Sequence, residues 1–278
     1  MQNKKIQYFE NLAKDFVDNI EINLQGSIKQ KTESITFKLE KVLDAFSNSN
    51  LNVQHFASLT GYGHGDLGRE IIDKIFAEVL EAEKAAVRVQ FVSGTHAIAS
   101  SLFGVLRPGD NFLSITGRPY ESLEEVIGLR GSCQGSLIDF GISYEEISLK
   151  NDGTIDFLAL EEALKIPRNL VFIQRSCGYT WRPSLSIQTI KEICYLCHKF
   201  QPNCICFVDN CYGEFVENHE PTSVGADLIA GSLIKNLGGT IVPTGGYVAG
   251  KFGLVDKACC RLTAPGIGSE GGITFNLN

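Results

Sequence analysis

The chain has 278 residues, of which 44% are hydrophobic and 21% are charged, and its formal net charge at pH 7 is -7. This balance is typical of a soluble globular protein, and the scattered basic residues argue against nucleic acid or an anionic membrane as a partner. No apolar run approaches the roughly 20 residues that a membrane-spanning helix needs, and the N-terminus lacks a signal-peptide pattern. We therefore expect a cytoplasmic protein.

Hydrophobic periodicity predicts two N-terminal helices joined near Gly26, followed by alternating short strands and helices. The expected elements in chain order are helices 4–24 and 28–48, a glycine-rich loop 61–70, helix 70–82, strand 85–92, helix 95–106, strand 111–116, helix 121–131, strand 142–149, helix 157–164, strand 169–174, helix 186–200, strands 204–210, 226–232 and 245–250, and helix 252–262. This alternation predicts a mostly parallel α/β sheet sandwiched by helices. The domains expected are a helical segment over 1–60 and a large α/β domain over 61–278.

Nine cysteines raise the question of haem, metal or disulfides. Cys194, Cys197 and His198 form a CxxCH pattern, and Cys204 and Cys206 follow closely. However, the first three lie in a segment with helical apolar spacing, and no second pair stands at zinc-site spacing. Without a signal peptide, the pattern favours buried, reduced thiols that behave as small hydrophobes, and no metal.

Ligands of parallel α/β sheets bind beyond the carboxyl ends of the strands. Ser93, Gly94 and Thr95 follow the first long strand and open a helix, where small residues let backbone N–H groups approach a phosphate. The loop has neither the GxxxxGK[ST] nor the GxGxxG pattern. Taken alone, it fits an ordinary strand-to-helix turn with a serine cap better than a phosphate-binding loop.

Two charged residues follow later strands. Asp209 ends the strand CICFVDN, where a buried acid is costly unless a positive group such as a pyridinium nitrogen meets it; a capping role or an arginine partner would also explain it. Lys235 follows an apolar strand, where desolvation would lower the pKa of its amine and favour attack on an aldehyde. Ser232 stands three residues earlier, and its hydroxyl could reach a phosphate. A phosphate loop, then an acid, then a lysine 26 residues beyond the acid is the order that pyridoxal phosphate (PLP) needs.

The sequence resembles the aluminium-resistance or methionine gamma-lyase-like family of fold-type I PLP-dependent enzymes, which is related to cystathionine beta-lyases. The segments that carry the resemblance are QFVSGTHAIA, SITGRPY, FIQRSCGYTWRPSL, FVDNCYGEF, ADLIAGSLIKN and RLTAPGIG. The resemblance runs from about residue 10 to the end of the chain. It implies a carbon–sulfur lyase that binds an amino-acid substrate of the cystathionine or methionine type and eliminates a thiol.

The resemblance also implies roles for single residues. Lys235 would hold PLP as an imine and act as the general base, Asp209 would keep the pyridine nitrogen protonated, and Tyr120 would stack on the ring. The cofactor-binding set would be Ser93, Gly94, Thr95, Tyr120, Asp209, Ser232 and Lys235. Tyr62 would enter the site of a neighbouring subunit in a homodimer or homotetramer, although a loop-packing role fits it as well. For Tyr120 the simpler reading is a half-buried tyrosine at a strand end.

Some features depart from this pattern or receive no role. Ile234 stands where many such lyases have a hydroxyl beside the lysine. Arg175, Trp181 and Arg182 lie in a stretch expected to wall the site, without individual functions. The small C-terminal domain of fold-type I enzymes, with its carboxylate-binding arginine, is expected to be absent from these 278 residues. An aminotransferase or another PLP enzyme, and a truncated protein that binds PLP without turnover, therefore remain alternatives.

Overall fold

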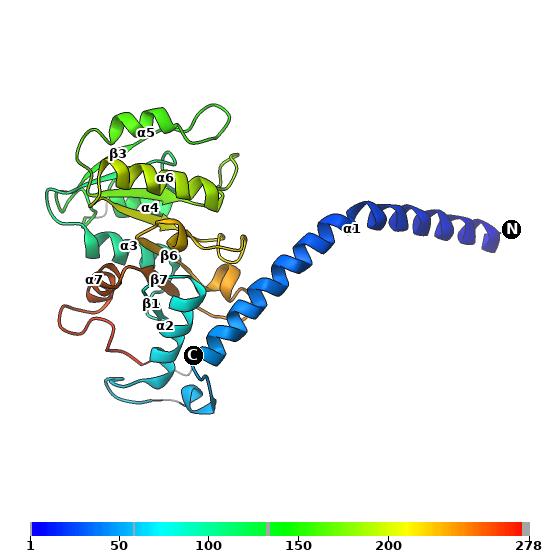
Figure 1. Ribbon diagram of the computed structural model, residues 1–278, viewed down its shortest axis with the longest axis horizontal. Helices are drawn as coiled ribbons and strands as arrows, with labels where there is room; N and C mark the ends of the chain where they lie inside the picture. Colours follow the sequence, from blue (N-terminus) through cyan, green and yellow to red (C-terminus); the bar gives the residue numbers. More distant parts are fainter. Residues whose placement is uncertain (1, 58, 132–133, 274–278) are drawn as a thin grey trace. The chain divides into compact units, whose positions relative to one another are not determined.

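The computed structural model describes residues 2–57, 59–131 and 134–273 (Figure 1). The helical elements are α1 (Gln2–Asn48), η1 (Val53–Phe56), α2 (Leu67–Val79), α3 (Gly94–Val105), α4 (Glu121–Ile127), α5 (Phe157–Ala163), α6 (Ile187–Phe200), η2 (Pro221–Val224), η3 (Leu233–Leu237) and α7 (Phe252–Leu262). The strands are β1 (Lys84–Arg88), β2 (Asn111–Ser114), β3 (Ser143–Glu146), β4 (Leu170–Gln174), β5 (Ile205–Asp209), β6 (Leu228–Ser232) and β7 (Gly246–Gly250).

The N-terminal region differs from its prediction. The sequence predicts two helices that meet near Gly26, whereas the structure has the single helix α1 over Gln2–Asn48. Gly26 is not among the glycines with positive φ, and a glycine inside a helix costs only about 1 kcal/mol relative to alanine, so it need not end the helix. The chain divides into two compact units, Met1–Leu43 and Asp44–Asn278. The predicted domain boundary at residue 60 stays a prediction.

The strands of the second unit form one seven-stranded sheet in the order β1-β7-β6-β5-β4-β2-β3. The strands from β6 to β3 in this order run parallel, whereas β7 is antiparallel to both β6 and β1. Arg88 at the end of β1 and Ser232 at the end of β6 both pair with Gly246. The carboxyl ends of β1 and of the parallel strands therefore meet at one edge of the sheet. The predicted mostly parallel α/β fold is confirmed.

Each face of the sheet carries its own apolar core and its own helices (Figure 1). On one face, α5 and α6 contribute fully buried side chains such as Leu160 and Ile190. On the opposite face, α3, α4 and α7 contribute Leu102, Leu123 and Val255. The central strands β4, β5 and β6 are buried on both sides, which explains their nearly uniform apolar sequences, whereas the edge strand β3 is polar and mostly exposed.

Local sequence signals account for where several helices begin. Asp66, Asp156 and Ser186 precede α2, α5 and α6, and each side chain accepts a hydrogen bond from a backbone N–H of the first turn. Such caps satisfy donors that have no partner within the helix. The first strand is shorter than predicted, because β1 ends at Arg88 and residues 89–90 form a turn before the loop at Ser93.

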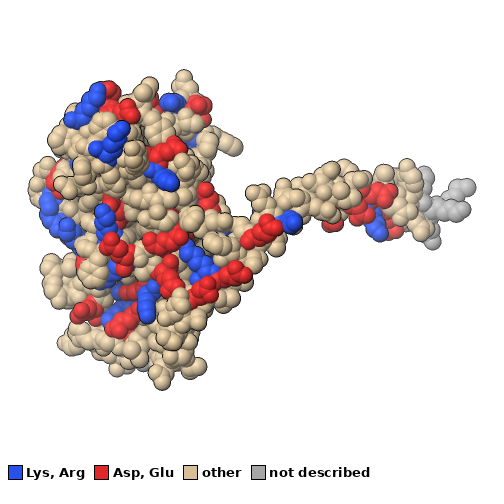
Figure 2. Space-filling view, in the orientation of Figure 1, with Lys and Arg blue, Asp and Glu red and all other residues tan. Residues whose placement is uncertain are grey.

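In the described part of the chain, no helix combines the length and apolar character that a membrane crossing requires. Figure 2 shows basic and acidic side chains interspersed over the visible face of the α/β unit, without a stripe of one sign. On this face, the charges do not gather into a field of one sign.

Candidate active site

A cavity of about 600 Å³ lies at the carboxyl edge of the sheet. Its lining includes Thr95, Tyr120, Asp209 and Lys235, which come from four separate segments of the chain. The structure thus brings four of the seven predicted cofactor-binding residues to one cavity. This is the position at which parallel α/β sheets bind their ligands.

Lys235 lies in η3, a single π-helical turn that follows β6 directly. Its backbone leaves helical geometry, with φ -103° and ψ -126°, and its Nζ lies 4.1 Å from the centroid of the Tyr212 ring. Burial lowers the pKa of Lys235, but Cys211, Tyr212 and Asp209 together outweigh burial, so that its pKa lies above the ordinary value. The pKa shift is therefore opposite to the one that desolvation alone predicts, because acidic groups surround the amine.

Asp209 is the last residue of β5 and is only 3% exposed. Its Oδ1 accepts a hydrogen bond from the backbone N–H of Cys211 at 3.0 Å. Burial raises the pKa of Asp209 above its usual range, while the Cys211 N–H and the charge of Lys235 lower it. A buried carboxyl group in this state gains stability from any cation that meets it in the cavity.

The predicted phosphate loop forms the start of α3. Ser93 is the N-cap, and its Oγ accepts a hydrogen bond from the N–H of His96 at 3.1 Å. Gly94 packs against the end of β6, because a Cβ at this position would lie 3.0 Å from the Cβ of Ser232 and 3.1 Å from the Sγ of Cys211. The serine cap and the close glycine together place the positive end of the α3 dipole at the carboxyl edge.

Tyr120 precedes α4 and is half-buried. Its hydroxyl lies 3.2 Å from the Oγ1 of Thr95, which also lies 3.3 Å from the Oγ of Ser122. Burial and the nearby charge of Asp209 raise the pKa of Tyr120, so the phenol keeps its proton. Tyr120 lines the cavity, which an ordinary strand-end tyrosine need not do. The predicted stacking of its ring on the cofactor stays a prediction.

Tyr62 does not line this cavity. Its side chain is 85% exposed, and its backbone oxygen accepts a hydrogen bond from the N–H of Gly272. A role in the site of a neighbouring subunit stays a prediction. Ser232 is buried at the end of β6 and lies behind Gly94 rather than in the cavity lining.

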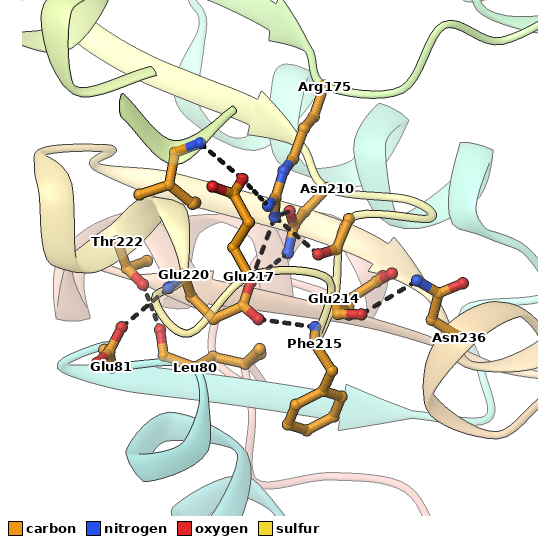
Figure 3. Close-up of polar contacts among 12 residues, drawn as sticks. Leu80, Glu81, Arg175, Asn210, Glu214, Phe215, Glu217, Glu220, Thr222 and Asn236 are labelled. Atoms are coloured by element: carbon orange, nitrogen blue, oxygen red, sulfur yellow. Dashed lines mark hydrogen bonds and ion pairs between the residues drawn. The ribbon is translucent and has the colours of Figure 1, made fainter. Parts of the chain in front are cut away.

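The sequence predicts that the stretch with Arg175, Trp181 and Arg182 forms a wall of the site, but these side chains differ in burial. Arg175 is buried and donates hydrogen bonds of 2.8 Å to the Oδ1 of Asn210 and to the backbone oxygen of Gly213 (Figure 3). It therefore braces the loop after β5 from inside the protein. Arg182 donates to backbone oxygens of its own segment, and Trp181 is fully exposed.

A buried polar network lies around that loop, and the sequence does not reveal it (Figure 3). Asn210 donates to the Oε2 of Glu220 at 3.0 Å, and the Tyr247 hydroxyl donates to the Oε1 of Glu214 at 2.9 Å. The side chain of Asn236 donates to the backbone oxygen of Glu214 at 3.0 Å. Because Asn210 follows Asp209 and Asn236 follows Lys235, this network joins the two segments that carry the candidate catalytic residues.

Cys211 and Tyr212 also line the cavity, although they are absent from the predicted site. Tyr212 has a φ of 66°, a conformation that non-glycine residues rarely adopt and that is common at functional sites. Both residues directly follow Asp209 in FVDNCYGEF, so their place after a buried strand was the signal that could have identified them.

Comparison with known proteins decides the family. A family profile described as methionine gamma-lyase matches residues 13–278. The chain belongs to the methionine gamma-lyase family. One solved relative is described as a carbon–sulfur lyase involved in aluminium resistance, in agreement with the resemblance seen in the sequence.

Two relatives share nearly half of their aligned residues with this chain. The uncharacterized protein YnbB of Bacillus subtilis is 47% identical over 265 residues, which cover 95% of this chain and 63% of YnbB. A carbon–sulfur lyase involved in aluminium resistance from Clostridium novyi is 48% identical with a TM-score of 0.88, over 92% of this chain and 61% of that one. The chain thus spans less than two thirds of the length of these relatives.

A more distant structure shares the fold alone. The pyridoxal-5'-phosphate dependent protein YhfS from Escherichia coli is 17% identical, with a TM-score of 0.65 over 88% of this chain and 62% of YhfS. Together with the family, this likeness identifies the sheet and its helices as the fold-type I architecture.

Proposed function

We propose that the cavity beside Lys235 binds PLP, and that the protein acts as a carbon–sulfur lyase on a sulfur-containing amino acid. The observation that carries the proposal is that Lys235 and the buried Asp209 line one cavity, next to the N-terminal turn of α3. An amine, a buried acid and a helix N-terminus match the aldehyde, the ring nitrogen and the phosphate of PLP. When bound, PLP supplies a reactive aldehyde and a ring that stores the electrons of a broken bond.

The residues of the chain divide the remaining tasks. Lys235 would hold the cofactor through Nζ and move a proton at that atom, and Asp209 would hold a positive charge at the far end of the cavity. Thr95 and the backbone N–H groups near Gly94 would bind the phosphate, with the α3 dipole favouring its charge. Tyr120 keeps its hydroxyl proton and covers one side of the cavity.

The environment of Lys235 sets a condition on cofactor capture. Because acidic neighbours raise its pKa, the free amine is protonated at neutral pH. Only the neutral amine is a nucleophile, so a proton must leave Nζ before the amine can attack an aldehyde. Cofactor capture should therefore be slow near neutral pH and become faster in alkaline solution.

The products formed from a sulfur-containing amino acid distinguish a lyase from an aminotransferase and from a protein without turnover. Purified protein loaded with PLP is incubated with cystathionine or methionine, and keto acid, ammonia and thiol are each measured. Release of thiol together with ammonia supports the lyase. Keto acid without thiol, formed only when a second keto acid accepts the amino group, would indicate an aminotransferase instead. Bound PLP with no product from either substrate would indicate a binding protein without turnover.

We propose further that the protein is a homodimer or homotetramer in the cytoplasm. Helix α1 exposes a series of large apolar side chains to solvent, which a second subunit would cover, and Tyr62 is free to reach a neighbouring site. The exposed apolar residues of the first unit include Phe9, Leu12 and Phe16. Light scattering tests the assembly, since a monomer that turns over substrate fully would contradict it.

A further inference from the structure

A cluster of thiol, imidazole and carboxylate groups lies away from the proposed PLP cavity. Cys194, Cys197 and His198 occupy α6, Cys206 lies in β5, and Asp227 directly precedes β6. The i, i+3 and i+4 spacing puts the three residues of α6 on one side of that helix, facing the sheet. We call these five residues the thiol–imidazole cluster. None of them lines the cavity that contains Lys235.

The ligand atoms of the cluster are close together. One ring nitrogen of His198, the Sγ of Cys206 and a carboxylate oxygen of Asp227 all lie within 4.8 Å of one another. The buried side chains of Cys194 and Cys197 belong to the same core cluster as Cys206 and lie beside its thiol. Neighbouring ligands of a tetrahedral zinc ion stand about 3–4 Å apart, given metal–ligand distances of about 2.0–2.3 Å. The separations are thus close to those that a metal requires.

The protein holds the carboxylate of Asp227 in a fixed orientation. Its Oδ2 accepts the backbone N–H of Cys206 at 2.7 Å and lies 2.9 Å from the Nε2 of His198. Its Oδ1 pairs with the Nζ of Lys251 at 2.6 Å. These contacts fix the positions of the Asp227 carboxylate and of the His198 ring next to the Cys206 thiol.

The cluster has a route to solvent. The three thiols are fully buried, but the His198 side chain is 30% exposed. His198 and Asp227 line a cavity of about 310 Å³ together with Glu81, Glu83 and Lys251. Glu81 and Glu83 contribute negative charge to the lining of this cavity, beside the ion pair of Lys251 with Asp227.

We propose that the thiol–imidazole cluster binds a thiophilic divalent cation, of which Zn²⁺ is the type. Cys206, His198 and Asp227 would supply three ligands, and the thiol of Cys194 or Cys197 a fourth. Thiolate and imidazole ligands favour zinc over magnesium or calcium. On binding, each ligating thiol exchanges its proton, which passes to solvent, for a bond to the metal, and no electrons are transferred.

The proposal revises what the cysteine spacing predicts. The sequence lacks a second cysteine pair at zinc-site spacing and so favours buried thiols without metal. The parallel pairing of β5 with β4 and β6 brings Cys206 and Asp227 to the α6 residues, a proximity that no local spacing encodes.

The test titrates Zn²⁺ into purified, chelator-treated protein and measures affinity by competition with a chromophoric chelator. The variants are His198→Gln, which changes a partly exposed side chain, and Cys206→Ala. The matched control is Cys259→Ala, because Cys259 is equally buried but belongs to the opposite core. We expect a single zinc ion per chain, an affinity at least about tenfold weaker in both variants, and no change in the control.

A second measurement does not depend on how well the variants fold. Co²⁺ added to the unmodified protein should produce a thiolate-to-cobalt charge-transfer band and the visible bands of a tetrahedral ion, and Zn²⁺ should abolish both. The PLP-free form is used, so that the cofactor does not absorb in the same region. Absence of the thiolate band, absence of stoichiometric zinc binding, or equal zinc affinity in His198→Gln and Cys259→Ala would each overturn the proposal.

Discussion

Gly94 packs so closely on Ser232 that a Cβ added to Gly94 would lie 3.0 Å from the Cβ of Ser232. This contact joins the first turn of α3 to the end of β6, the strand that leads into Lys235. The Cβ of Ser232 is fixed to its own backbone, so an added Cβ would require this part of β6 to shift, and the Sγ of Cys211 would also have to give way. The approach therefore explains why the loop SGT carries its glycine at this position.

Gly94→Ala is expected to destabilise the protein by about 1–3 kcal/mol, the usual cost of overpacking, and to weaken PLP binding. Denaturant unfolding and PLP titration measure the two effects. The control is Gly253→Ala in α7, where an added Cβ meets nothing within 4 Å, so alanine should be neutral or stabilise by up to about 1 kcal/mol. Equal effects of the two substitutions would contradict the packing argument.

Lys235→Ala should remove the yellow colour of PLP-loaded protein and the adduct that borohydride fixes to the chain. In the unmodified protein, the rate of colour formation should rise between pH 7 and 9 by up to about tenfold per pH unit, since the raised pKa of Lys235 keeps the amine protonated there. Lys191→Ala, which changes an exposed lysine of α6, is the control. Mass spectrometry that finds the adduct on another lysine, or a flat rate over this range, would refute the assignment.

Asp209→Asn should have opposite effects on stability and on chemistry. Burial raises the pKa of Asp209, so the ionised carboxylate destabilises the PLP-free fold at neutral pH, and its neutral isostere should raise the Tm by a few degrees, about 2–4 °C for each kcal/mol. Exchange of the substrate α-proton should fall at least about 100-fold, equivalent to about 2.7 kcal/mol of barrier.

Thermal unfolding without PLP and deuterium exchange with PLP separate these two effects of Asp209→Asn. Asp152→Asn, in an exposed turn, serves as the control. Exchange at the normal rate in Asp209→Asn would remove Asp209 from the mechanism.

Glu214 should make stability depend on pH. Burial raises its pKa from 4.5 to about 7, so the folded protein binds a proton that the unfolded chain has released. The contribution of Glu214 is therefore greatest below about pH 4.5 and is lost as the pH rises to about 7, by about 3 kcal/mol over this range.

Glu214→Gln should flatten that part of the stability profile, whereas Glu125→Gln, an exposed change in α4, should leave it unchanged. Urea unfolding at intervals between pH 4.5 and 8 measures both profiles. If Glu214→Gln retains the slope of the unmodified protein, another buried group is responsible. The amide oxygen of glutamine can still accept the hydrogen bond that the Tyr247 hydroxyl donates to Glu214, so the substitution removes the ionisation and keeps this contact.

The sequence by itself determined most of the helices and strands of the α/β unit and the order in which the candidate cofactor-binding residues follow one another along the chain. The central strands β4, β5 and β6 are largely apolar because they are buried on both faces, and the helices show apolar residues at helical spacing, so local patterns suffice to predict the α/β alternation. The positions of Asp209 and Lys235 after strands follow from the same local reading, because every parallel strand ends at the same edge of the sheet.

Only the tertiary structure decided which groups meet. Gly26 carries a local breaker signal, yet the helix continues through it. Arg175 looks like a site residue in the sequence, whereas the fold buries it against Asn210. Cys206 comes to lie beside Cys197 because the strand order places β5 in the middle of the sheet. Such contacts depend on the pairing of strands that are distant in the sequence. The same pairing brings Asp209 and Cys211 close to Lys235, where they raise its pKa instead of leaving it lowered by burial.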